Sequence, residues 1–219
     1  MKPFVLIVFV LISFNMTSQT CLCWEGNYFG EFETPALKTF KFSNGKELML
    51  CPPVFYNLDN DTVAYYRNFD LQDCSSKKQI ESFYNELSYT ANFQRDTLTI
   101  QAIADLPVGH NRTFVKMEWI AESFYFNKEA VENFHTLNRN IRKYSSQEIK
   151  QTLAEYEAGP EVLKGTTNEL IGRLFMCVIS GNEMAGKYFL DFENRFNVRY
   201  LEQLDVYDTY LAMLEQWKL

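Results

Sequence analysis

Alternating apolar and polar residues dominate the first half of the chain and predict antiparallel strands. Residues 37–51 form a hairpin pattern around Asn44-Gly45. This pair accepts the positive φ values of a type I′ turn, whose twist matches that of the flanking strands. Phe40 and Phe42 would then share one face of the first strand.

Two further strands are expected at residues 96–104 and 113–126. In the second, Trp119 falls on the apolar side, whereas Glu118 and Glu122 fall on the opposite side. This alternation is typical of an antiparallel sheet with one solvated face. Both glutamates are therefore predicted to point into solvent.

Between these strands, residues 75–88 carry a helical pattern. Ser76 and Gln79 have the spacing of a capping box. The apolar residues that follow repeat with helical spacing, at Ile80, Phe83, Tyr84 and Leu87. A helix packed on the sheet is predicted here.

From Asn127 onward the apolar spacing is helical. Asn127 is predicted to cap a helix over 128–143, and Ser145 with Glu148 forms a second capping box. The expected helices after it are 146–158, ended by Gly159-Pro160, then a helical hairpin of 166–180 and 183–196, and a last helix beginning at 201 or 204 and ending at 217.

Strands followed by helices indicate an α+β fold. We expect an N-terminal antiparallel β-rich half with one packed helix, and a C-terminal all-helical half of about four to five helices. The predicted organisation is a signal peptide at 1–18, a β-rich subdomain at 19–126 and a helical subdomain at 127–219. A weaker strand is expected at 62–67.

The N-terminal segment has the pattern of a secretory signal peptide. Lys2 precedes an apolar run from Pro3 to Phe14, and a polar stretch ends at Ser18. Twelve residues are too few for a membrane span, which needs about 20. The sequence predicts a periplasmic or extracellular protein with no transmembrane span in the mature chain.

Four cysteines of the β-rich half are disulfide candidates: Cys21, Cys23, Cys51 and Cys74. A bond between the first two would close a strained ring, so we expect each to pair with one of the later two, in either connectivity. Cys177 lies in an apolar helix and is expected to be a buried free thiol. A lipid anchor on Cys21, at the outer membrane, is the alternative, although the residues before Cys21 fit a lipoprotein site poorly.

Charge argues against nucleic acid as a partner. The formal charge is −7, and removing residues 1–18 takes away one lysine and leaves −8. No cofactor or metal site is predicted. Gly181 to Tyr188 departs from a phosphate-binding loop because Tyr188 stands where a small hydroxyl residue is needed, and Asp59 and Asp61 lack the remaining ligands of a calcium loop.

The weak catalytic candidate is His110, in the loop between the last two predicted strands. Asp105 and Glu118 are the carboxylates nearest to it in this arrangement. A small hydrolase using His110 with one of these carboxylates is an alternative function.

Aromatic residues make up 16% of the chain and crowd the β-rich half. Neighbours on a strand point to opposite faces, so one member of Tyr65-Tyr66 and one of Tyr125-Phe126 is expected at the surface. The leading hypothesis is a non-enzymatic binding or cell-envelope-associated module that recognises an envelope protein or a carbohydrate through such aromatics.

Overall fold

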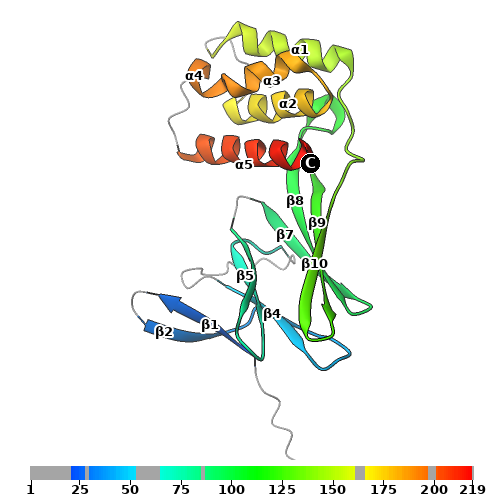
Figure 1. The fold of residues 1–219 in the computed structure, drawn as a ribbon. Helices are drawn as coiled ribbons and strands as arrows, with labels where there is room; N and C mark the ends of the chain where they lie inside the picture. The colour runs from blue at the N-terminus through cyan, green and yellow to red at the C-terminus, as the bar shows by residue number, and fades with distance from the viewer. Residues whose placement is uncertain are drawn as a thin grey trace, which may run out of the picture.

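The computed structural model is an α+β protein in which helices gather at one end and antiparallel sheets fill the other (Figure 1). It describes residues 21–27, 30–52, 65–84, 87–160, 166–196 and 201–218. The predicted signal peptide and part of the weak strand at 62–67 lie outside these residues. Tyr66 itself forms an isolated bridge with Tyr89.

The first four-stranded sheet has the order β3-β4-β5-β6 and begins with the predicted hairpin. The turn differs from type I′ because Gly45 has a positive φ, 82°, and Asn44 does not. Gly45 donates to the carbonyl of Phe42, as in a three-residue loop that ends in a glycine bulge. The strands are β3 (Lys38–Lys41), β4 (Glu47–Cys51), β5 (Phe69–Asp73) and β6 (Gln79–Phe83).

The predicted helix at 75–88 is wrong, because β6 occupies its middle. The carboxylate of Asp73 accepts hydrogen bonds from the hydroxyls of Ser75 and Ser76, and Lys77 follows with φ of 56°. These bonds make a tight turn that returns the chain alongside β5. Ser76 therefore stabilises a turn where a helix cap was expected.

The second four-stranded sheet has the order β10-β9-β8-β7. Its last hairpin replaces the helix predicted at 128–143, so the C-terminal half is not all-helical. Lys128 turns the chain with φ of 57°, and polar pairs such as Tyr125 with Glu132 join the two strands. The strands are β7 (Ser88–Gln94), β8 (Thr97–Leu106), β9 (Val115–Asn127) and β10 (Ala130–Leu137).

A bulge in β9 reverses which residues face the core. Ala102 pairs with Ile120, but Ile103 pairs with Glu118, so Trp119 is an extra residue. Beyond this bulge the even-numbered residues lie opposite the buried positions of β8. Glu122, predicted on the solvent side, is directly opposite the buried Ile100.

The helical region agrees closely with its sequence signals. Ser145 and Glu148 form the predicted capping box, and Gly159 ends the first helix with φ of 80°. The predicted helical hairpin is present, with a break at Asp191 that divides its second arm. The helices are α1 (Ser146–Ala158), α2 (Thr167–Ile179), α3 (Glu183–Leu190), α4 (Phe192–Phe196) and α5 (Leu201–Lys218).

Helix α5 lies between the other helices and the second sheet (Figure 1). The indole ring of Trp119 stacks on Trp217 and contacts Phe175 of α2. The Tyr210 hydroxyl donates to the backbone carbonyl of Asp105 on β8. These contacts make one continuous apolar core that extends from the helices into both four-stranded sheets.

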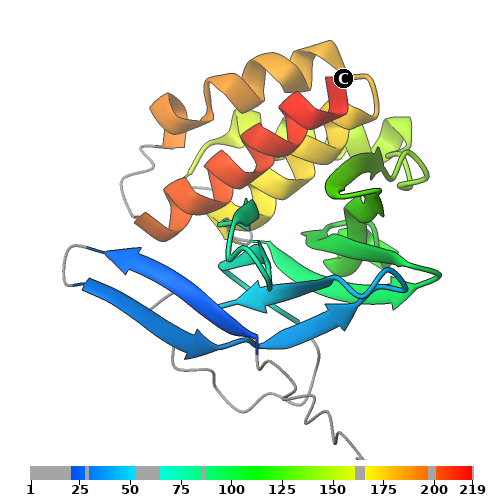
Figure 2. The same ribbon diagram turned by 60° about the horizontal axis from the view of Figure 1, so that its bottom comes forward.

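Two disulfides fasten the start of the described chain to the first sheet. Cys21 pairs with Cys74 and Cys23 with Cys51, which settles the connectivity that the sequence left open. The adjoining hairpin of β1 (Leu22–Asn27) and β2 (Gly30–Pro35) extends to the side opposite the β9–β10 hairpin (Figure 2). Cys177 is a buried free thiol, as predicted.

Candidate functional site

The catalytic candidate His110 is exposed in a short 3-10 turn, η1 (His110–Arg112), between β8 and β9. It lines an open polar hollow of about 510 Å³ beside the start of α1. Asp105 lies elsewhere, 3.5 Å from the ammonium group of Lys116, and Glu118 accepts a hydrogen bond from Gln101. Neither carboxylate is among the residues that line the His110 hollow.

The carboxylate that does line this hollow is Glu148, the capping residue of α1. The guanidinium of Arg142 binds it through two nitrogens, and with further hydrogen bonds from Ser145 this lowers its pKa to about 2. A carboxylate held so firmly in its ionised form is a poor proton acceptor near neutral pH. Glu148 is therefore poorly suited to accept a proton from His110 or from a substrate in this hollow.

The predicted aromatic pairs do point to opposite sides. Tyr65 is 42% exposed with the Lys116 ammonium over its ring, whereas Tyr66 packs against Phe69. Tyr125 lies beside Phe134, which is 53% exposed, on the outer face of the β9–β10 hairpin.

The inward partner in the second pair is Phe126. Its ring makes an edge-to-face contact with the ring of Phe42, which directly follows β3. Tyr65, which precedes β5, is therefore exposed, and Tyr125 of β9 is half-buried with its hydroxyl bonded to Glu132. Whether either binds a ligand stays a prediction.

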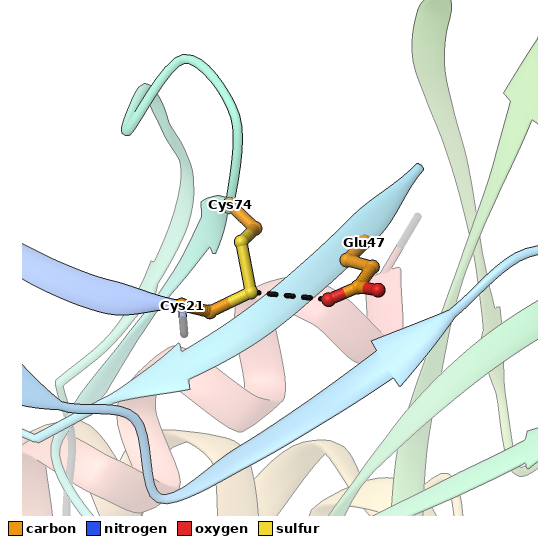
Figure 3. Close-up of side chains that lie close together, drawn as sticks. All are labelled: Cys21, Glu47 and Cys74. Atoms are coloured by element: carbon orange, nitrogen blue, oxygen red, sulfur yellow. Dashed lines mark hydrogen bonds between the residues drawn. A yellow bond between two sulfur atoms is a disulfide. The ribbon is translucent and has the colours of Figure 1, made fainter. Parts of the chain in front are cut away.

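One group of three potential metal ligands lies together among the described residues: Cys21, Glu47 and Cys74. Figure 3 shows the carboxylate of Glu47 pointing toward the disulfide, 3.1 Å from the sulfur of Cys21. A disulfide sulfur carries no proton to donate and is no thiolate to bind a metal. In the oxidised protein this contact is structural.

A cleft of about 180 Å³ opens where the two sheets and the C-terminal end of α5 meet. Its walls come from β6, β7, β8, β9 and α5, and most are apolar. The lining residues are Glu81, Ser82, Phe83, Leu87, Tyr89, Ile100, Ala102, Ile120, Glu122 and Gln216. We call it the interlayer cleft.

Two carboxylates enter the interlayer cleft from core-facing positions. Glu81 stands opposite the buried Leu71 on the first sheet, and Glu122 stands opposite the buried Ile100 on the second. Each glutamate lies two residues before a buried phenylalanine, Phe83 or Phe124, and so shares a face of the strand with it. Charged groups at such positions are uncommon and lower stability unless they are paired or solvated.

The environment of Glu122 disfavours its charged form. Burial raises the pKa of Glu122, a hydrogen bond from Asn133 lowers it, the negative charge of Glu81 raises it, and His135 lowers it, with a net upward shift. The Asn133 amide donates to Glu122 at 2.6 Å, and His135 is directly opposite Glu122 on β10. The two acids are thus close enough to repel each other across the cleft.

A second crevice of about 150 Å³ continues from this cleft beneath α5. Leu87 lines both spaces, and Ala104 continues the row of small core-facing residues on β8. Arg67 stands in the wall of this crevice and donates a hydrogen bond to the Ser88 hydroxyl. Asp105 also lines this crevice, so the second crevice carries one positive and one negative side chain, whereas the interlayer cleft carries two acids.

Sequence reasoning missed both cleft carboxylates. Glu81 was assigned to a helix that does not form, and Glu122 was assigned to the solvent side because a bulge cannot be seen in the alternation. The signal that could have located Glu122 is its position two residues after Ile120 and two before Phe124, which places all three side chains on one face of a strand.

A comparison with models of known protein families gave no match, and none was found among curated proteins or solved structures. Across the part of the chain that the structure describes, every helix is too short or too polar to cross a membrane.

Proposed function

We propose that this chain is an exported, non-enzymatic binding protein that takes its ligand in the interlayer cleft. The observation that carries the proposal is the pair Glu81 and Glu122, placed at core-facing positions around an open, mainly apolar cleft. Ligand sites are usually mostly apolar pockets with a small number of polar groups that point into them.

Export is supported by the cysteines and by the N-terminal sequence. Disulfides persist in oxidising compartments such as the periplasm and the extracellular space. The sulfur of Cys21 is bonded to Cys74, and a lipid anchor would need that same atom. This favours a periplasmic or secreted protein over a membrane-tethered lipoprotein.

The hydrolase alternative has less support. His110 and Asp105 line separate spaces, and the Glu148 carboxylate near His110 is engaged by Arg142. A binding role needs no such proton relay. Substitution of His110 by alanine is therefore expected to leave ligand binding intact.

Export is tested by the intact mass of the secreted full-length chain, measured with and without reduction. The proposal expects a mature chain that begins near Gln19, carries no lipid and gains four hydrogen atoms on reduction. A retained N-terminus, or a mass that includes acyl chains, would overturn this part.

Ligand binding is tested by a thermal-shift screen of small metabolites, oligosaccharides and peptides. Ile120→Phe places a larger side chain in the cleft wall, and Ile149→Phe is the matched control on α1. The proposal expects a ligand that stabilises the wild type and the control but not Ile120→Phe. A ligand lost instead from Tyr65→Ala or Tyr125→Ala would place binding on the outer aromatics.

A further inference from the structure

Resting on the proposed function, we infer that the interlayer cleft accepts a primary ammonium group carried on a short unbranched apolar chain. The inference concerns the chemical class of the ligand. It follows from the charge, lining and size of the cleft taken together.

The charged residues that line the cleft are both acidic. Glu81 enters from the first sheet and Glu122 from the second, and no lysine or arginine is among the lining residues that the structure describes. An opposite charge placed between two carboxylates removes their mutual repulsion and restores interactions lost on burial. An anionic ligand would add to the repulsion.

Helix α5 adds to the preference for a cation. Gln216 lines the cleft two residues before the helix ends at Lys218. The C-terminal end of a helix carries a partial negative charge of about half an electron. The indole of Trp119 donates to the side-chain oxygen of Gln216 and holds that side chain in place.

The imidazole of His135 is the one basic side chain that influences Glu122 among the described residues. It lies on β10 opposite Glu122, but it is exposed and absent from the cleft lining. The Asn133 amide uses one Glu122 oxygen, Oε1. The other oxygen, Oε2, accepts no hydrogen bond from the described part of the chain, and Glu122 lines the cleft.

The remaining walls define the body of the ligand. Phe83 and Ile100 are buried and apolar, Tyr89 is buried as well, and the small side chain of Ala102 keeps the space open. A cleft of 180 Å³ is smaller than the roughly 300–1,000 Å³ of pockets that hold drug-sized molecules. A linear alkyl chain of a few carbons fits these limits, as in a small amine or a lysine side chain.

A divalent metal fits the cleft less well. Calcium takes about six to eight oxygen ligands, and two glutamates with largely apolar walls do not supply them. Among the described residues, Glu81 and Glu122 belong to no group of three clustered metal-binding side chains.

Isothermal titration of the full mature chain with n-pentylamine tests the inference. Pentanol and pentanoate keep the chain and change the head group, and calcium chloride tests for a metal. We expect pentylamine to bind at least about tenfold more tightly than either analogue, as an interaction with a buried charge predicts. Nα-acetyl-lysine N-methylamide distinguishes a protein side chain from a free amine as the source of the group.

The variants Glu81→Gln and Glu122→Gln should each weaken pentylamine binding by about tenfold or more. Glu215→Gln removes the same charge from the exposed face of α5 and should leave binding unchanged. Equal binding of pentanol, preference for pentanoate or calcium, or indifference to both variants would overturn the inference. If the Ile120→Phe screen still identifies a cleft ligand of another class, the proposed function stands and only the ammonium assignment fails.

Discussion

Trp119 donates its indole N–H to the side-chain oxygen of Gln216 at 2.6 Å, which connects the bulge in β9 to the end of α5. Trp119 is fully buried, so this donor has no access to solvent. Gln216→Ala should lower the free energy of unfolding by about 1–3 kcal/mol, the cost of an unsatisfied buried donor. Urea unfolding followed by tryptophan fluorescence measures the loss, and Glu215→Ala on the exposed face should show little change. Equal stability of the two variants would contradict this role.

The disulfide between Cys23 and Cys51 is buried against Met49, so its removal should strongly destabilise the first sheet. The double variant Cys23→Ser, Cys51→Ser is expected to lose about 2–5 kcal/mol of unfolding free energy. A reducing agent should destabilise the wild type more than this variant, because the wild type loses two disulfides on reduction and the variant loses only one. Stability that is indifferent to reduction would refute the structural role of both bonds.

The cap of α1 should give a stability that depends on acid pH. Arg142 and Ser145 hold the pKa of Glu148 at about 2, below its ordinary value. The stabilisation is present above the ordinary glutamate pKa and is lost as the pH falls through about 2. Glu148→Gln should flatten the stability profile in this range, whereas Ser145→Ala should cost about 1 kcal/mol near neutral pH. Chemical unfolding at a series of pH values measures both effects.

Glu122 should have the opposite effect. Burial raises the pKa of Glu122, so the folded protein binds a proton at this carboxylate more tightly than the unfolded chain does. The resulting stabilisation is present below the ordinary glutamate pKa and is lost as the pH rises through the raised value. Glu81, His135 and Asn133 are the polar groups that influence Glu122.

Glu122→Gln should therefore be slightly more stable than the wild type at neutral pH, and the two should converge in acid. The Asn133 amide can still donate to the glutamine oxygen. Thermal melting across the pH range measures the difference, with Glu215→Gln as the control. A Glu122→Gln variant that is less stable at neutral pH would show that the charge is favourable in the unliganded protein.

Local signals were sufficient for much of the fold. The capping box of Ser145 and Glu148 is a bond between neighbours in sequence, and it located α1 to the residue. Gly45 and Gly159 mark turns that need a positive φ. The set of four bonded cysteines followed from their number and from the strained ring that Cys21 and Cys23 would form.

The position of the cleft carboxylates depends on long-range contacts, which local sequence signals do not contain. Ser76 has the spacing of a helix cap, but its hydroxyl donates to Asp73 in a turn that the pairing of β6 with β5 stabilises. Trp119 is accommodated as a bulge because α2 and α5 offer it partners, and that extra residue turns Glu122 inward. Both carboxylates were therefore misplaced for reasons outside their own local sequence.

Chemical-shift mapping of the isotope-labelled mature chain during titration with n-pentylamine tests the central claim most directly. Binding in the interlayer cleft predicts saturable shifts centred on residues 81–83, 120–122 and 216, and their loss in Glu122→Gln. Shifts confined to the His110 loop or to the outer face around Tyr125, or no saturable shifts at all, would contradict the account.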